Sequence, residues 1–197
     1  MTAAAESTPS LQREWWLRAL AVFTSPRGTF AALSDDSPEG AEARQEPIMA
    51  IVILAGIAGV LSTSLAGRLM DDPNYDGLNV AVWAFLGGAF YGFLAYWGGG
   101  LLVYAIAAAV RVRASYRQAR QIVGLAMAPV ALSLIVLWPV RLGIYGEDVF
   151  RTGGSDTGAG DKLLEVLLVG SFAWSFALVV LGLIELRKRS SSSSAIA

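Results

Sequence analysis

Residues 77–110, GLNVAVWAFLGGAFYGFLAYWGGGLLVYAIAAAV, decide the fold, because they form 34 consecutive residues without a charged side chain. About 20 apolar residues suffice for a helix to cross a bilayer, and 34 would reach about 50 Å against a hydrocarbon core of about 30 Å. The stretch is therefore either one long helix, tilted or kinked, or a hairpin of two spans. The only obvious break, at glycines 98–100, leaves about ten residues beyond it, which are too few to cross. We predict one helix.

Three further uncharged runs have the length of a membrane span: residues 47–67, 121–140 and 166–184. Each predicts a helix, because unsatisfied backbone groups cannot lie in hydrocarbon. Composition agrees, since 55% of the residues are apolar, only 16% are charged and the mean hydropathy is +0.54. The sequence predicts an all-α integral membrane bundle with about four transmembrane helices, at residues 47–67, 78–110, 118–140 and 163–186.

The charges test this number of spans. The connector at 111–120 carries four arginines and no acid, and residues 187–189 are all basic, whereas acids dominate the connectors at 68–76 and 141–165. Lys and Arg concentrate on the cytoplasmic side of membrane proteins. Four spans place both basic segments on the side of the N-terminus, while a hairpin in residues 77–110 would separate them. We therefore predict a multi-pass protein of the cell membrane with both termini in the cytoplasm.

The segment before the first span has a different character. Residues 1–10 are predicted to be disordered, residues 11–34 to form an amphipathic helix and turn, and residues 35–46 to be an acidic linker. Trp15 and Trp16 would anchor the helix in the membrane interface, where indole rings are favoured. The alternative is a short helix packed on the cytoplasmic ends of the bundle. Residues 187–197 are predicted to be a basic, serine-rich tail.

Two short motifs accompany this layout. Phe23-Thr-Ser-Pro-Arg-Gly-Thr-Phe30 follows the amphipathic segment, and Ser115-Tyr-Arg-Gln118 precedes Gly124-Leu-Ala-Met-Ala-Pro129. After a glycine-rich second span, they resemble the Yip (Ypt-interacting protein) domain family over roughly residues 15–186. The resemblance implies a small polytopic membrane protein; eukaryotic members are linked to small trafficking GTPases and membrane shaping, and bacterial ones are mostly of unknown function. Family members are usually drawn with five spans, whereas four are predicted here.

The chain contains no Cys and no His. This excludes thiol nucleophiles, imidazole bases and the usual Cys/His zinc sites. The glycine-rich residues 153–162 fail the spacing of a phosphate-binding loop. Asp76 and Asp161 resemble the YD and GxGD pair of intramembrane aspartyl proteases, but both precede their spans. We predict a non-enzymatic protein with no catalytic residues, no cofactor and no nucleic-acid partner.

One weak metal candidate lies in the connector before the second span. Asp72, Asn74 and Asp76 match the first half of a calcium loop, D-x-N-x-D-G, but the twelfth position holds Trp83 where a glutamate is needed. The alternative is an acidic turn that caps the helix.

Two features concern helix packing. Pro129 is predicted to kink the third span and free the carbonyl near Leu125, which in transporters can mark a substrate site. Small residues at every fourth position, Ala84, Gly88 and Gly92, permit close helix contact, either within the chain or in a homodimer.

The functional hypothesis rests on the basic patch formed by Arg111, Arg113, Arg117 and Arg120. It predicts a membrane scaffold that binds membrane lipids, including anionic ones, or a membrane-protein partner or second copy. The alternative explanation of the patch is orientation in the membrane alone. The alternative function is a small permease-like or lipid-handling transport protein built around the kinked third helix. No ionisable residue lies deep in any predicted span, which argues against a pump.

Overall fold

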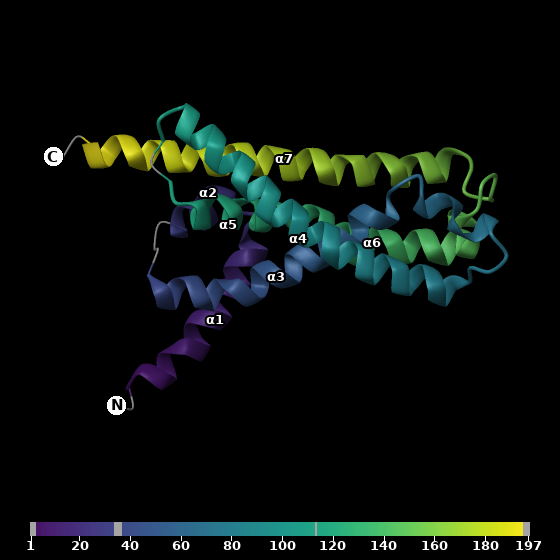
Figure 1. Cartoon of the computed structure of the whole chain (residues 1–197), viewed down its shortest axis with the longest axis horizontal. Coiled ribbons are helices and arrows are strands. Elements are labelled where there is room, and N and C mark those ends of the chain that lie inside the picture. Colours follow the sequence, from purple (N-terminus) through teal and green to yellow (C-terminus); the bar gives the residue numbers. More distant parts are fainter. Residues whose placement is uncertain (1–2, 34–36, 113, 195–197) are drawn as a thin grey trace.

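Four long helices dominate the computed structural model, which describes residues 3–33, 37–112 and 114–194 (Figure 1). In chain order the elements are α1 (Ala3–Ala21), α2 (Pro26–Ala32), α3 (Pro38–Leu61), η1 (Ala66–Asp71), α4 (Gly77–Ala109), α5 (Tyr116–Ala126), α6 (Ala128–Tyr145), η2 (Gly146–Phe150) and α7 (Ala159–Ser194). No strand occurs in this described part of the chain. Four helical units are long and apolar enough to cross a membrane: α3, α4, α5 and α6 taken together, and α7. This confirms the predicted all-α bundle with four spans.

α4 is a single helix, as the uncharged run predicted. Asp76 caps its first turn by accepting a hydrogen bond from the Asn79 N–H at 2.8 Å. The helix continues through glycines 98–100 without interruption. Gly100 instead permits close contact with α5, because a Cβ there would lie 2.5 Å from the Cβ of Arg120.

The third predicted span consists of two helices that meet at Met127. α5 ends at Ala126 and α6 begins at Ala128, so Pro129 lies in the first turn of α6. Proline is accepted there because the first N–H groups of a helix have no partner within it. The helix is therefore interrupted two residues before Pro129.

Two helices begin earlier than the sequence predicted. α3 starts at Pro38, so residues 38–46 are helical and the prediction of a linker at 35–46 is wrong for them; residues 35–36 lie outside the described part. The Ser37 hydroxyl accepts a hydrogen bond from the Gly40 N–H at 3.1 Å, and Glu39 lies in the first turn, where the helix dipole favours negative charge. α1 starts at Ala3, within the segment predicted to be disordered, where three successive alanines favour helix. α7 also extends through the predicted tail as far as Ser194.

Small residues bring α3 and α4 into close contact. Ala84, Gly88 and Gly92 are all buried on the α3 side of α4. A Cβ at Gly88 would lie 2.5 Å from the Ile57 Cα, and one at Gly92 would lie 2.5 Å from the Val52 carbonyl oxygen. These three residues therefore serve packing within the chain, the first of the two predicted uses.

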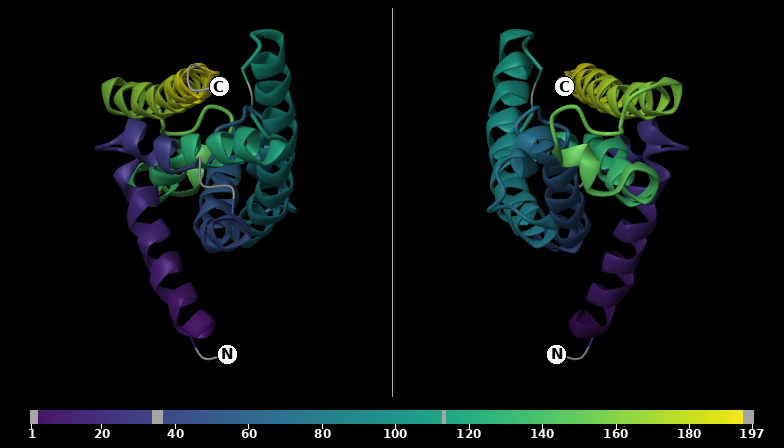
Figure 2. Two further views of the ribbon diagram at one scale, coloured as in Figure 1. Left: turned by 90° about the vertical axis from the view of Figure 1, so that its left-hand side faces the viewer. Right: turned by 90° about the vertical axis from the view of Figure 1, so that its right-hand side faces the viewer.

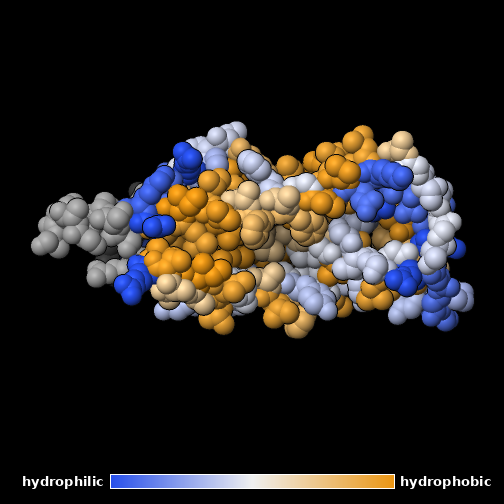
Figure 3. Space-filling model, turned by 90° about the horizontal axis from the view of Figure 1, so that it is seen from above, coloured by the Kyte–Doolittle hydropathy of each residue, from blue (hydrophilic) through white to orange (hydrophobic). Residues whose placement is uncertain are grey.

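Polar residues gather at the two ends of the bundle, with apolar surface between them (Figure 3). The end that carries α1, α2, the start of α5 and the end of α7 is termed the basic end. The opposite end, with η1, η2 and the start of α7, is termed the acidic end (Figure 1). α1 and the end of α7 lie at the same end, as four crossings require.

Candidate functional site

The predicted basic patch lies in the connection from α4 to α5, at the basic end. Arg111 and Arg117 are exposed. Arg111 has a φ of 58°, so it adopts the left-handed conformation where the chain leaves α4. Arg113 lies outside the described residues. Arg187 and Lys188 are also exposed near the end of α7, so two separate segments contribute cationic side chains to this end.

Arg120 is held in an aromatic cage rather than at the surface. Its guanidinium carbon lies 4.4 Å from the ring centre of Trp97, and 5.7 and 5.9 Å from those of Tyr96 and Tyr116. The Tyr116 hydroxyl donates a hydrogen bond to the Trp97 carbonyl at 2.9 Å, which fixes the third ring. A desolvated cation–π contact contributes about 2 kcal/mol. Arg120 therefore joins α4 to α5 and is not an exposed part of the patch.

Hydrogen bonds hold the start of α5 against α2 and α3. Ser115 and Gln118 form a capping box, with bonds of 3.0 and 3.1 Å between each side chain and the other's backbone N–H. The Gln118 amide also donates to the Leu33 carbonyl at 3.4 Å. Arg44, which is fully buried, donates from Nε to the Gln121 side-chain oxygen at 2.9 Å. The 115–118 motif thus fixes the position from which Arg117 projects.

The N-terminal segment packs on the bundle through Trp15. This side chain is 3% exposed, and its ring centre lies 5.4 Å from the Arg44 guanidinium carbon. Ala19 and Val22 are buried in the same core. The prediction of Trp15 as an interfacial anchor is therefore wrong, because the indole lies within the protein on a buried cation. Trp16 is 38% exposed and stays accessible to a membrane surface.

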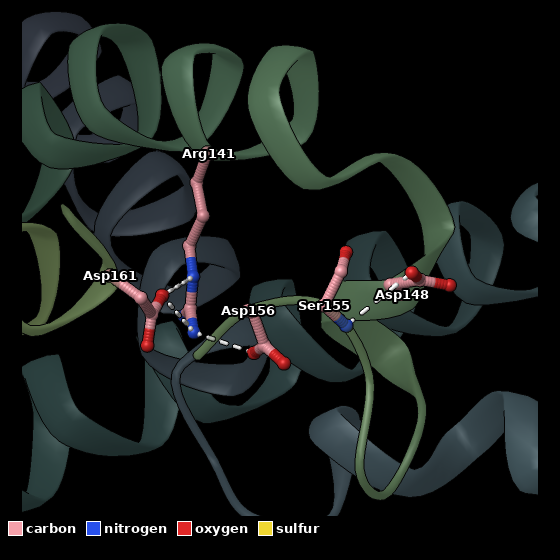
Figure 4. Close-up of polar contacts among 5 residues, drawn as sticks. All are labelled: Arg141, Asp148, Ser155, Asp156 and Asp161. Atoms are coloured by element: carbon pink, nitrogen blue, oxygen red, sulfur yellow. Dashed lines mark hydrogen bonds and ion pairs between the residues drawn. The ribbon is translucent and has the colours of Figure 1, made fainter. Parts of the chain in front are cut away.

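At the acidic end, Arg141 binds Asp156, in the loop before α7, and Asp161, in the first turn of α7 (Figure 4). Its Nη2 lies 3.1 Å from Asp156 Oδ2 and 3.0 Å from Asp161 Oδ1. The three side chains are between 13% and 20% exposed, so water screens them only partly. Asp148 accepts a further bond from the Ser155 N–H at 3.4 Å. Arg141 therefore fixes the start of α7 against α6.

A second contact joins η1 to the loop after η2. Thr152 donates to Asp71 from its N–H at 2.7 Å and from its hydroxyl at 2.5 Å. These two hydrogen bonds lower the pKa of the Asp71 carboxyl below its ordinary value of 3.8, because they stabilise its charged form.

The weak calcium candidate is a turn followed by a helix cap. Asp72 accepts hydrogen bonds from the Asn74 N–H at 2.9 Å and the Asn74 amide at 2.8 Å, and Asp76 caps α4. Within the described ranges, no group of three or more His, Cys, Asp or Glu residues is placed to hold a metal ion. Asp161, the second member of the protease-like pair, is engaged by Arg141.

A cavity of about 280 Å³ lies beside Pro129, where the transport hypothesis requires a polar site. Its lining is apolar apart from two serines. The hydroxyls of Ser133 and Ser171 donate to the Val130 and Leu168 carbonyls of their own helices, each at 2.7 Å. The polar groups of this cavity are thus already engaged.

Two arginines that organise the ends were not identified from the sequence. Arg141 could have been, because it follows an uncharged run and precedes a loop rich in acids. Arg44 could not, since its partners Trp15 and Gln121 are distant in the sequence and only the fold brings them together.

These features define a helical membrane protein with four candidate spans and organised polar ends. The Yip1 domain family matches residues 20–197, most of the chain, and the chain belongs to this family. Its members are generally non-catalytic membrane proteins. The match confirms the resemblance drawn from the motifs at 23–30 and 115–129. No curated protein and no solved structure is significantly similar to the chain.

Proposed function

We propose that the chain is a non-catalytic membrane scaffold whose basic end binds anionic lipid headgroups on the cytoplasmic face of the cell membrane. The observation that supports this most directly is the exposure of Arg111 and Arg117 at the same end as Arg187 and Lys188. Each such side chain near an anionic leaflet contributes about 1 kcal/mol of attraction.

The surroundings of Arg117 support binding rather than orientation alone. Orientation in the membrane requires only charge, whereas here the start of α5 is rigid. The capping box at Ser115 and the cage around Arg120 fix the helix from which Arg117 projects. A charge held in place loses less conformational entropy when it binds a headgroup.

The exposed surface of α1 adds an apolar contact. Trp16 is 38% exposed, and the neighbouring Leu17 and Leu20 are 60% and 65% exposed. Amphipathic helices bind membrane surfaces through such apolar area combined with cationic attraction. α1 thus contributes to the proposed lipid contact through Trp16 rather than Trp15.

The lipid contact is testable with a fluorescent phosphatidylglycerol analogue and the protein in mild detergent, read by fluorescence anisotropy. The double variant Arg111→Gln/Arg117→Gln should bind the analogue more weakly, by about fivefold for each arginine. The matched control is Arg151→Gln/Lys162→Gln, which removes two exposed cations of the acidic end. Equal losses in both double variants would contradict a specific role of the basic end.

The proposed orientation has its own test. The chain has no native cysteine, so single cysteines report sidedness directly. Thr24→Cys at the basic end should react with a membrane-impermeant thiol reagent only after permeabilisation, and Ser155→Cys at the acidic end should react in intact cells. Labelling of Ser155→Cys only from the cytoplasmic side would overturn the orientation.

A further inference from the structure

Two cavities adjoin at the acidic end. The first, of about 470 Å³, has a mixed lining whose polar residues include Ser62, Arg141, Asp156, Asp161 and Glu165. The second, of about 520 Å³, is an apolar groove with Gly59, Val60, Trp83, Tyr91 and Met127 in its wall. Thr63 and Phe172 line both. The two therefore form one continuous composite cavity, with a polar part and an apolar part.

The groove exists because α7 packs on one side only. It contacts α6, α5 and α2, whereas only sparse contacts join it to α3 or α4. Figure 2 shows α7 and α4 on separate sides of the bundle, consistent with this. The groove walls come from α3 and α4 on one side and α7 on the other, with α5 and α6 at the base. No helix of the described chain covers it, so it is accessible from the lipid.

The polar part lies at the level of the lipid headgroups, and the apolar part lies deeper, at the level of the hydrocarbon. Arg141 comes directly after the uncharged residues 121–140, and Glu165 comes directly before the uncharged residues 166–184. The polar part thus lies at the level where the spans leave the hydrocarbon. The groove extends from it toward the middle of α4, at Tyr91 and Gly92. A headgroup at the interface with an acyl chain below it has the same arrangement.

The side chains of the polar part favour a ligand group that is positively charged and donates hydrogen bonds. Its three carboxylates outnumber the single guanidinium of Arg141, which is engaged with Asp156 and Asp161. Glu165 lines the cavity and forms no ion pair with any described residue. The Ser62 hydroxyl donates to the Ala58 carbonyl at 2.7 Å, so it offers the cavity its lone pairs. These groups accept hydrogen bonds, and a primary ammonium supplies three.

We propose that this composite cavity binds a phosphatidylethanolamine of the adjacent leaflet, with the headgroup ammonium on Glu165 and one acyl chain in the groove. A phosphatidylcholine headgroup has no N–H to donate, and its quaternary ammonium is recognised by aromatic cages rather than by carboxylates. A phosphatidylglycerol headgroup is anionic and is repelled by the excess of carboxylates.

Ser175 agrees with an occupied groove. Ser175 lines the groove, and its hydroxyl oxygen is buried and has no hydrogen-bond partner among the described residues. Serine in a membrane helix normally bonds to a carbonyl one turn earlier, as Ser171 does with Leu168. Ser175 lies about 4.5 Å further along the helix axis than Phe172, so its hydroxyl is one turn below the headgroup cavity. After rotation toward the groove, this hydroxyl would donate a hydrogen bond to an ester oxygen of the lipid at that depth.

The test is native mass spectrometry of the protein in mild detergent, titrated with phosphatidylethanolamine, phosphatidylcholine or phosphatidylglycerol of identical acyl chains. Glu165→Gln removes the proposed ammonium partner, and Gly59→Leu fills the groove. Gly59 suits this because a Cβ there meets nothing within 4 Å. Glu147→Gln is the matched control, since Glu147 is an exposed acid of the same end that does not line the cavity. Thermal unfolding shows whether each variant folds.

We expect the unmodified chain to retain phosphatidylethanolamine in preference to phosphatidylcholine by roughly fivefold, the upper value for an ion pair with an exposed partner such as Glu165. Glu165→Gln should abolish this preference, Gly59→Leu should abolish retention of phosphatidylethanolamine and phosphatidylcholine, and Glu147→Gln should change neither. Equal retention of the two zwitterionic lipids by the unmodified chain would overturn the proposal without any variant. Unaltered binding of the two zwitterionic lipids in a folded Gly59→Leu variant would also overturn it. Phosphatidylglycerol is the lipid class proposed for the basic end, so Gly59→Leu should leave its retention unchanged, and its loss in a folded Gly59→Leu variant would place this lipid in the groove and overturn the proposal.

Discussion

Gly88 offers the sharpest test of the helix packing. In Gly88→Ala the new Cβ would lie 2.5 Å from the Ile57 Cα and 2.6 Å from the Ile57 nitrogen. Carbon atoms in contact prefer about 3.5–4.0 Å, so α3 and α4 would have to separate by about 1 Å. Backbone atoms cannot rotate away as a side chain can. The destabilisation should therefore reach the upper end of the cost of overpacking, about 3 kcal/mol.

The matched control is Gly98→Ala in the same helix, where a Cβ meets nothing within 4 Å. Alanine is favoured over glycine inside a helix by roughly 0.5–1 kcal/mol, so this variant should be neutral or slightly stabilised. The assay is thermal unfolding in mild detergent, followed by tryptophan fluorescence. For a chain of this size, about 2–4 °C per kcal/mol places Gly88→Ala about 6–12 °C below the unmodified protein. Equal melting of the two variants would refute the close contact of α3 and α4.

Three further outcomes are expected. Trp97→Leu removes the ring nearest Arg120 and should destabilise the protein by about 2 kcal/mol, whereas Trp16→Leu, at a 38% exposed site, should change the unfolding temperature little. Arg141→Gln leaves Asp156 and Asp161 without their cation. It should lower the free energy of unfolding by about 2 kcal/mol, between the values for exposed and buried pairs, and speed hydrogen exchange in the loop before α7. The control is Arg151→Gln, at a half-exposed site. Asp71 has a pKa below 3.8 in the fold, so its contact with Thr152 is complete above that pH and is lost as pH falls through the lowered pKa. In Thr152→Val the Asp71 pKa, measured by NMR titration, should return toward 3.8, and an unchanged pKa would contradict the assigned cause.

The number of candidate spans and their helical class followed from the sequence because hydrocarbon tolerates so few alternatives. A run such as 77–110 without charge has to be helical, and the charges on either side fix the number of crossings. The start of α3 could also be predicted, since Ser37, Pro38 and Glu39 are residue types typical of the beginning of a helix. The acidic composition of residues 35–46 predicts a linker, but over residues 38–46 these helix-start residues outweigh it.

The organisation of the two ends was largely beyond prediction. Trp15 has the spacing of an interfacial residue, and its burial depends on Arg44, which reaches it only through the packing of α1 on α3. In the sequence, Arg120 is equivalent to the other three arginines of the basic patch. In the fold, the close contact at Gly100 and three aromatic rings give it a separate role. The composite cavity exists because α7 packs only sparsely against α3 and α4. The periodicity of apolar residues does not report which helices pack against one another. A sequence pattern reports which face of a helix is apolar, but not whether protein or lipid covers it.

The length and continuity of α7 have a mechanical consequence. It is a single helix of 36 residues without a proline, about 54 Å long, and it crosses the whole molecule with one side packed. Such a helix behaves as a stiff lever rather than as a hinge. A tilt of about 10° around its midpoint would shift each extremity by about 5 Å in opposite directions. Any motion that widens the polar part of the composite cavity near Asp161 would therefore be transmitted directly to Arg187 and Lys188 on the other face of the membrane.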